Sequence, residues 1–265
     1  MNTNGNIYTV VYTTLIVVVV AGILAAAASF LKPAQQANIK AETISQMLQA
    51  AQFETEGLNN VQKLDKYAEE IDRAFVIDAS GAKIRDLDVS REGIELIDNL
   101  KAQNYAISGK NGIELGLPVY VLKNGVSIIP CYGAGLWGPV WGYLAIEPDG
   151  VTIKGAYFDH ESETAGLGSR IKDDPSFRAQ FVGRRIAWGS EKQFAIVKGG
   201  APEGQDNAID AITGATMTSR GLENAIDVWM ATYAKYFLAE VEDSSDDVNA
   251  NDDVNGDDAK EVKED

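Results

Sequence analysis

The chain has very little of the chemistry on which many enzymes depend. Its 265 residues include one cysteine, Cys131, and one histidine, His160. A single cysteine excludes an internal disulfide framework, and a single histidine excludes a multi-histidine metal cage. A Ser-His-Asp triad fits this composition only through His160. We therefore expect no catalytic residues of these kinds and no metal site.

Positive charge is also scarce, with 23 Lys and Arg against 39 Asp and Glu and a formal net charge of −16. Residues 240–265 contain twelve acidic residues and two lysines, so this end carries most of the net charge. Binding to a phosphate backbone needs a basic surface, so nucleic acid is not expected as a partner. The segment 241–265 has few apolar residues and is predicted to be a disordered, solvating tail rather than a binding segment.

Charge is absent from the start of the chain. No Asp, Glu, Lys or Arg precedes Lys32, and residues 8–30 are almost entirely apolar. As a helix, this stretch would be about 35 Å long, which is enough to cross the hydrocarbon core of a bilayer. Tyr8, Tyr12 and Phe30 lie near its ends, where aromatic side chains favour the membrane interface. The pattern predicts a transmembrane helix.

A cleaved signal peptide is the alternative for this segment. The first residues carry no Lys or Arg, although signal peptides normally have them. We therefore predict a short tail at 1–7 and a retained transmembrane helix at 8–31. Lys32 and Lys40 argue weakly for a cytoplasmic side after the helix, and charge alone does not settle the orientation.

The rest of the chain predicts an α+β fold, with antiparallel strands and flanking helices. We divide it into a juxtamembrane helical and mixed segment at 32–100 and a compact domain at 101–240. Asn124-Gly125 predicts a type I′ hairpin turn, because these residues tolerate two positive φ values. The predicted elements are helical residues 33–65 with a break at 57–60, a strand at 73–77, hairpins of 118–122 with 126–132 and 140–147 with 151–158, a helix at 174–183 and a strand at 194–199.

The last predicted helix carries an apolar stripe at helical spacing. Trp229 lies on that stripe and is interpreted as a core residue rather than a cofactor contact. Cys131 follows the strand period and is interpreted as a small buried residue. The stripe consists of Leu222, Ile226, Trp229, Tyr233 and Phe237.

Four hydroxyl residues surround Gly214 just before this helix: Thr213, Thr216, Thr218 and Ser219. One of them would suffice as an N-cap. The alternative is a phosphate site, because free N–H groups and the helix dipole favour an anion at a helix start. Gly214 and Ala215 would let the backbone approach the phosphate, and Arg220 would balance its charge. From the residues alone, both interpretations stay open.

The run TGATMTS at 213–219 resembles the flavinylation motif of the FMN-binding domain family. In that family a threonine directly after Gly-Ala carries FMN through a phosphoester, which implies Thr216 here. Thr218 is the neighbour most easily confused with it, and Asp210 also fits the family pattern. A threonine hydroxyl is a weak nucleophile, so the resemblance implies an external flavin transferase.

Further blocks extend the resemblance over roughly residues 1–240. Together they are similar to the C-subunit family of the sodium-translocating NADH:quinone oxidoreductases. The blocks are GAGLWGPVWGYLAI at 133–146, HESETAGLG at 160–168, FRAQFVGRR at 177–185 and IVKGGAP at 196–202.

This resemblance implies an electron-transfer subunit that relays electrons toward quinone in a multi-subunit complex of the bacterial inner membrane. It makes 101–240 the FMN-binding domain and puts that domain in the periplasm. We expect no G-x-G-x-x-G run after a strand, and the chain is therefore not expected to bind NADH itself. One helix cannot form a sodium channel, so sodium movement would need partner subunits.

The resemblance also implies flavin contacts. Glu163 and Thr164 would hydrogen-bond the ring or ribityl groups, Leu167 would cover a ring face, and Trp137 would line the pocket. Lys198 would lie close to the flavin and raise its potential by attracting the reduced, anionic form. Without the resemblance, these residues read as an ordinary turn, a packed loop and a solvated charge. The implied site is completed by Gly168, Gly214, Ala215 and Thr218.

Two other functions remain open from the sequence. The first is the flavinylated G subunit of an Rnf-type ferredoxin:NAD oxidoreductase, in which the 133–146 and 160–168 blocks also have counterparts. The block at 196–202 and the overall length favour the sodium pump. The second is a membrane-anchored binding domain without redox function, in which Thr-Gly-Ala-Thr serves only as a cap.

Overall fold

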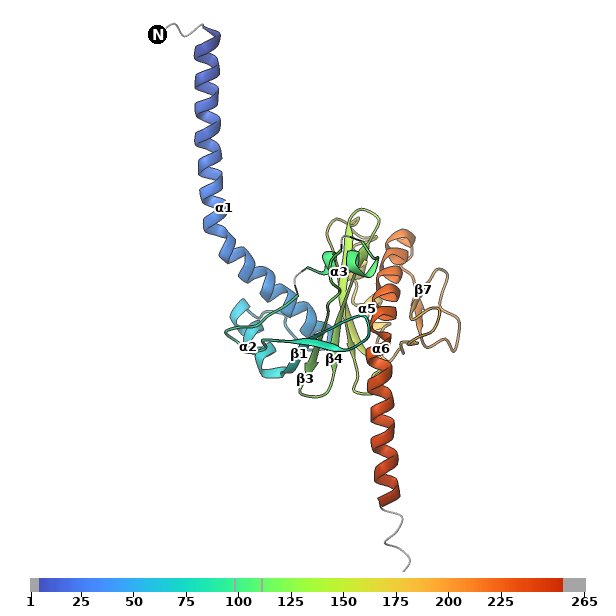
Figure 1. Cartoon of the computed structure of the whole chain (residues 1–265). Helices are drawn as coiled ribbons and strands as arrows, with labels where there is room; N and C mark the ends of the chain where they lie inside the picture. Colours follow the sequence, from blue (N-terminus) through green and yellow to red (C-terminus); the bar gives the residue numbers. More distant parts are fainter. Residues whose placement is uncertain (1–4, 98, 111, 255–265) are drawn as a thin grey trace, which may run out of the picture. The chain divides into compact units, whose positions relative to one another are not determined.

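The computed structural model describes residues 5–97, 99–110 and 112–254, and these form two compact units with a boundary between Thr43 and Ile44 (Figure 1). The first unit contains helix α1 as far as Thr43, and the whole helix runs from Asn6 to Ala50 with Pro33 inside it. This helix is long and apolar enough to cross a membrane. The predicted transmembrane segment is therefore part of a longer helix that does not end at residue 31.

The second unit is built on a six-stranded antiparallel sheet in the order β2-β1-β3-β4-β5-β6. The predicted α+β fold with antiparallel strands is confirmed. The strands are β1 (Ile71–Ile77), β2 (Lys83–Leu87), β3 (Leu117–Leu122), β4 (Ser127–Ala134), β5 (Pro139–Ile146) and β6 (Ile153–His160).

Both faces of this sheet are covered, as the central strand β3 shows. All six of its residues are buried. Val119 and Val121 face a cluster that includes the apolar stripe of α6 (Thr216–Val254). Tyr120 and Leu122 face a second cluster, which contains the last turns of α1 and Tyr67 of α2 (Asn60–Glu70). Successive strand residues point to opposite faces, so one strand contributes to two cores.

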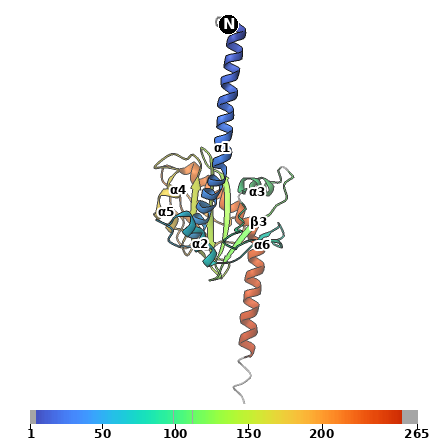
Figure 2. The same cartoon turned by 90° about the vertical axis from the view of Figure 1, so that its left-hand side faces the viewer.

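Short helices flank the sheet. Helix α3 (Leu100–Ile107) contacts β4 and α6, whereas α4 (Arg170–Asp173) and α5 (Pro175–Ala179) contact β6. Figure 2 shows α4 and α5 on one side of the view and α3 on the other. Pro175 occupies the first turn of α5, as predicted, where its missing N–H costs nothing.

The predicted hairpin at Asn124-Gly125 is present, but its predicted turn type is wrong. Gly125 has φ +83°, whereas Gln52 is the only non-glycine residue with positive φ among those described. The Gly125 N–H donates to the Leu122 carbonyl at 2.8 Å. This is a type I turn followed by a glycine in the left-handed conformation. Such a loop suits the right-handed twist of the two strands and needs one positive φ, whereas a type I′ turn needs two.

The stripe predicted for the last helix is confirmed. Leu222, Ile226, Trp229, Tyr233 and Phe237 are at most 2% exposed. The Trp229 side chain is therefore a core residue, and its Nε1–H donates to Asn104 Oδ1 of α3 at 3.1 Å.

Two predicted boundaries differ from the structure. Strands β1 and β2 come from the predicted juxtamembrane segment 32–100, yet β1 pairs with β3, so the compact unit begins at Ile44 rather than at residue 101. Helix α6 continues to Val254, although disorder was predicted from residue 241. Extending a docked helix avoids the cost of nucleation, which composition alone does not register. Residues 255–265 of the predicted tail lie outside the described part.

Candidate functional site

The site begins where a small parallel sheet meets the start of α6. Strands β7 (Ala195–Val197) and β8 (Ala208–Asp210) pair in parallel, and a turn leads from β8 to Thr216. Gly214 in this turn has φ +83°, and a Cβ there would lie 3.1 Å from Leu167 Cδ2. Glycine avoids the strain of that φ and lets the loop of Leu167 approach the helix start.

The four hydroxyls at this turn have different surroundings. Ser219 is 1% exposed, and its Oγ accepts a hydrogen bond from the Ile212 N–H at 3.2 Å. Thr218 is also 1% exposed, and its Oγ1 donates to Glu163 Oε2 at 2.7 Å. Thr213 lies exposed on the turn, and Thr216 is half-buried. Within residues 5–97, 99–110 and 112–254, the Thr216 hydroxyl makes no hydrogen bond.

Glu163 joins three segments that are distant in sequence. Its Oε1 accepts the N–H groups of Leu136 and Trp137 at 2.7 and 3.1 Å, and its Oε2 accepts the Thr218 hydroxyl. Glu163 is only 8% exposed, and three donors compensate the desolvation of its carboxylate. We call Glu163 with Leu136, Trp137 and Thr218 the Glu163 clamp. Both carboxylate oxygens bind protein groups, so the clamp ties the hairpin tip to the start of α6, and the flavin contact expected for Glu163 stays a prediction.

Glycines allow the clamp to close. A Cβ at Gly168 would lie 2.4 Å from Glu163 Oε2 and 2.7 Å from Thr218 Oγ1. A Cβ at Gly135 would lie 2.4 Å from Glu163 Oε1. These separations are far below contact distance, so a side chain at either position would force the clamp apart.

One glycine spacing was not recognised in the sequence. Gly133, Gly135 and Gly138 match G-x-G-x-x-G, but in the structure they lie at the β4–β5 hairpin, where the Gly135 N–H donates to the Gly138 carbonyl at 2.8 Å. The run leads into strand β5 instead of opening a helix. It therefore lacks the helix N-terminus that binds a dinucleotide pyrophosphate.

A cavity of about 240 Å³ lies beside Thr216. Glu223 in its wall pairs with Lys192 at 3.1 Å. Lys198 and Arg220 have no ion pair with any carboxylate in the described part of the chain. The cavity therefore has uncompensated positive charge at the N-terminus of α6. It is lined by Ile196, Val197, Lys198, Ala211, Thr216, Ser219, Arg220 and Glu223.

Large apolar side chains lie exposed around the same helix turn. Leu167 packs near Gly214, Met217 follows Thr216, and the other two form the tip of the β4–β5 hairpin held by Glu163. We call these four residues the apolar rim. They are Leu136 at 48% exposure, Trp137 at 67%, Leu167 at 42% and Met217 at 55%.

The structure thus brings most of the predicted residues to the start of α6, in two groups. Lys198 shares the cavity with Thr216, whereas Trp137, Leu167 and Gly168 lie with the clamp and the apolar rim. Thr164 is exposed, and its carbonyl accepts the Leu167 N–H at 3.1 Å. Leu136 and Met217 were not predicted, because the sequence does not show whether an apolar side chain is exposed or buried.

The single cysteine and the single histidine both lie in structural surroundings. Cys131 is fully buried, and burial raises the pKa of its thiol well above the ordinary value. His160 Nδ1 accepts the Glu163 N–H at 3.1 Å, which fixes the loop that carries the clamp. Among the residues that the structure describes, no group of three or more metal-ligating side chains occurs.

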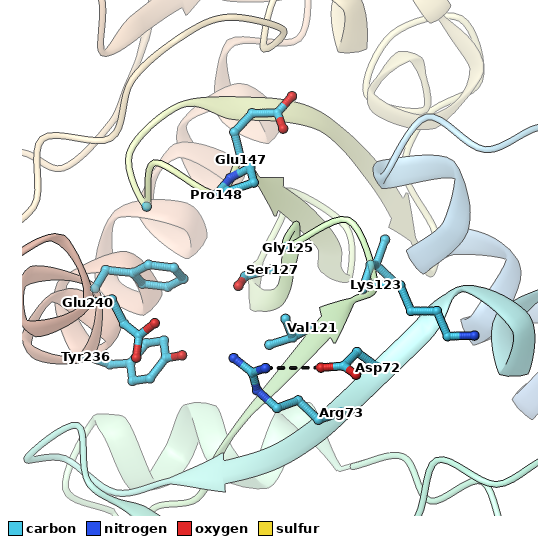
Figure 3. A pocket seen from close by; sticks show the side chains of 13 residues that line it. Asp72, Arg73, Val121, Lys123, Gly125, Ser127, Glu147, Pro148, Tyr236 and Glu240 are labelled. Carbon is cyan, nitrogen blue, oxygen red and sulfur yellow. Dashed lines mark hydrogen bonds and ion pairs between the residues drawn. The ribbon is translucent and has the colours of Figure 1, made fainter. Parts of the chain in front are cut away.

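A second cavity, of about 180 Å³, lies near the two β-hairpin turns and residues 236–240 of α6 (Figure 3). Arg73 points toward Tyr236 and pairs with Asp72 at 3.1 Å, while Lys123 extends away (Figure 3). Its acidic residues, Asp72, Glu147 and Glu240, outnumber its basic residues, Arg73 and Lys123, so it lacks the excess positive charge that a phosphate needs. It is therefore a weaker candidate than the cavity beside Thr216.

The chain resembles known proteins over the same region. The sequence model of the FMN-binding domain matches residues 135–231. The C subunit of the Na(+)-translocating NADH-quinone reductase of Vibrio parahaemolyticus is 33% identical over 246 residues, which covers 83% of this chain and 89% of that protein. The corresponding C subunit of Vibrio vulnificus is 40% identical over 131 residues, 47% of this chain, and the chain spans only 51% of that relative's length.

Solved structures show the same fold. The crystal structure of the C subunit from Parabacteroides distasonis has a TM-score of 0.65 and 32% identity, covering 78% of this chain and 96% of that one. The Shewanella oneidensis structure has a TM-score of 0.62 and 25% identity, covering 79% and 99%.

Proposed function

The chain belongs to the C-subunit family of the Na(+)-translocating NADH-quinone reductases, and from this premise we propose that it is an electron-transfer subunit with FMN joined to Thr216 by a phosphoester. Bound FMN supplies reversible one- and two-electron transfer. The protein's own residues attach the cofactor, balance its charge and shield it. No residue is proposed as a general acid or base.

The observation that carries this proposal is the free Thr216 hydroxyl. Thr218 and Ser219 are buried and hydrogen-bonded, so neither is accessible to a transferase without breaking the site. Thr216 is half-buried and lines the cavity. This difference supports Thr216 over Thr218 independently of the family motif.

Charge around Thr216 supports a phosphate at this position. The first N–H groups of α6 have no carbonyl partner within the helix, and the helix dipole adds positive potential there. Lys198 and Arg220 line the adjoining cavity without ion-pair partners among the described residues. Together they would hold the phosphoester and, in the case of Lys198, favour the negative charge that a flavin gains on reduction.

The apolar rim supports a flat aromatic group beside the phosphate. Exposed apolar side chains are unfavourable in water, and four large ones gather around this helix turn. Trp137 and Leu167 are the side chains that we propose would cover the flavin ring. The Glu163 clamp would hold the backbone that carries Trp137.

We further propose a setting in the bacterial inner membrane, with α1 as a single anchor and the FMN-binding domain in the periplasm. The apolar length of α1 supports the anchor. The partners would be the other subunits of a sodium-pumping NADH:quinone reductase, as the relatives' names suggest, and a flavin transferase that matures the chain. Sodium movement and NADH oxidation would belong to those partners.

Peptide mapping tests the proposal. The full-length chain is purified from its native host with the membrane complex, and the mass of the tryptic fragment 199–220 is measured by mass spectrometry. We expect the added mass of one FMN on this fragment, complete loss of it in Thr216→Ala, and retention in the control Thr213→Ala, which removes an exposed hydroxyl of the same turn. An unmodified wild-type fragment, or covalent flavin that persists in Thr216→Ala, would overturn the assignment.

A further inference from the structure

The last turns of α1 belong to the compact unit and pack on the sheet. Ile44, Met47 and Leu48 are fully buried in the core cluster on this face. A Cβ on Gly155 of β6 would lie 2.5 Å from the Ala50 carbonyl, so the helix end approaches the strand closely. Two polar side chains of this helix end are also buried, and while Ser45 bonds Thr55, Gln46, at 4% exposure, reaches the sheet.

The Gln46 amide makes two directional contacts. Its Nε2 donates to Asp159 Oδ2 of β6 at 3.0 Å, and its Oε1 accepts the Trp141 Nε1–H of β5 at 3.3 Å. Trp141 and Asp159 are register partners on adjacent strands, so one amide bridges both. Apolar packing alone would tolerate small shifts of the helix, whereas buried hydrogen bonds define one arrangement.

Asp159 is a buried carboxylate whose charge is well compensated. It is 7% exposed. Besides Gln46, its Oδ2 accepts Lys172 Nζ at 2.8 Å, and its Oδ1 accepts the His160 N–H at 2.8 Å. A carboxylate with this burial depends on its donors, so loss of one is expected to disturb the end of β6.

The end of β6 leads directly into the clamp. His160 follows Asp159, and its Nδ1 accepts the Glu163 N–H. Glu163 then binds the hairpin tip and Thr218, two residues from Thr216. A chain of hydrogen bonds therefore runs from the foot of α1 to the first turn of α6.

We infer that Gln46, in the last turns of α1, and Asp159, at the end of β6, are positioning residues that fix the Glu163 clamp. They touch neither Thr216 nor its cavity and act only through β6 and His160. A role of these residues in holding the flavin site rests on the proposed function, since it needs a flavin at Thr216. The hydrogen-bond path itself does not, which makes it testable separately.

Amide hydrogen exchange of the flavinylated full-length chain in detergent provides the test. Gln46→Leu keeps the side-chain volume close to that of glutamine and removes both contacts. The matched control is Gln49→Leu, which lies one turn later in α1 and donates only to Ser45 Oγ. We expect Gln46→Leu to speed exchange at the Leu136, Trp137 and Glu163 amides about five- to tenfold, the effect of losing one buried hydrogen bond locally.

The pattern of exchange distinguishes positioning from general destabilisation. Amides of β1 and β3 should keep their wild-type rates in Gln46→Leu, and Gln49→Leu should leave the clamp amides unchanged. Equal acceleration throughout the sheet, or unchanged clamp amides, would overturn the inference. If Gln46→Leu does not fold, Lys172→Met removes another donor to Asp159 from a more exposed position and should give a smaller change at the same amides.

Flavin content is measured on the same samples. Absence of covalent flavin in the wild-type protein would count against the proposed function and leave the exchange comparison intact. Normal flavin content with unchanged clamp amides in Gln46→Leu would sink only the positioning role.

Discussion

The stretch of α6 from Thr216 to Phe237 is built in opposite ways at its two ends. The Trp229 and Tyr233 side chains are completely buried, and their polar atoms are hydrogen-bonded. Several turns earlier, Thr216 is half-buried, Met217 is 55% exposed and Arg220 has no ion pair among the described residues. The packed end provides stability, and the unpacked end retains an accessible hydroxyl. A rigid helix can thus hold a reactive hydroxyl that is not itself fully buried or hydrogen-bonded within the fold.

The largest loss of stability is expected at the packed end. Trp229→Ala removes a fully buried indole and leaves Asn104 without its partner, which should cost about 3–5 kcal/mol of unfolding free energy. Urea denaturation followed by circular dichroism measures it. A cost similar to that of Met217→Ala at the exposed end would contradict the comparison.

The next effect concerns the clamp between the two ends. Glu163→Ala removes the acceptor of two N–H groups and the Thr218 hydroxyl, and we expect a cost of about 2–3 kcal/mol. Glu161→Ala is the control, since Glu161 is exposed in the same loop. Urea denaturation of both variants measures this cost. Equal urea midpoints for Glu163→Ala and Glu161→Ala would show that the clamp contributes no stability.

A smaller effect is expected at Gly168. Gly168→Ala puts a methyl group against the Glu163 carboxylate and should cost about 1–2 kcal/mol, because the loop can shift by part of the overlap. The same substitution in the Glu163→Ala background should cost clearly less, since the clashing carboxylate is gone. Additive costs in this double-mutant cycle would argue that the clash is not with Glu163.

The smallest effect is electrostatic. Lys198→Met should lower the flavin midpoint potential, because a cation near the flavin favours the reduced, negatively charged form. The side chain is exposed, so the change should correspond to less than about 1 kcal/mol and shrink at high salt. Redox titration of the flavinylated protein at two ionic strengths measures it. A potential that rises, or a shift independent of salt, would contradict this role.

Periodicity and turn residues were enough to predict much of this fold. The strand at 73–77, both hairpins and the α6 stripe are local patterns, and each was located correctly. Strand β2 was missed because four of its five residues are exposed and show no apolar alternation. The type of turn at Asn124 was also missed, because Asn-Gly is compatible with more than one backbone path.

Residues of the candidate site could be predicted only where they belong to a sequence motif. Thr216, Lys198 and Leu167 entered through a resemblance, whereas the clamp depends on contacts between Glu163 and residues far away in sequence. No local pattern reports that a carboxylate will point inward toward the tip of a hairpin. The exposure of Met217 is equally a property of tertiary packing.

The buried sulfur of Cys131 has a practical consequence for spectroscopy. It is the sole thiol of the chain and is inaccessible inside the sheet. A cysteine introduced at an exposed position such as Val182 would therefore be the one reactive site for a maleimide dye or spin label. Distances from such a probe to the start of α6 become measurable in the wild-type background, without first replacing a native residue.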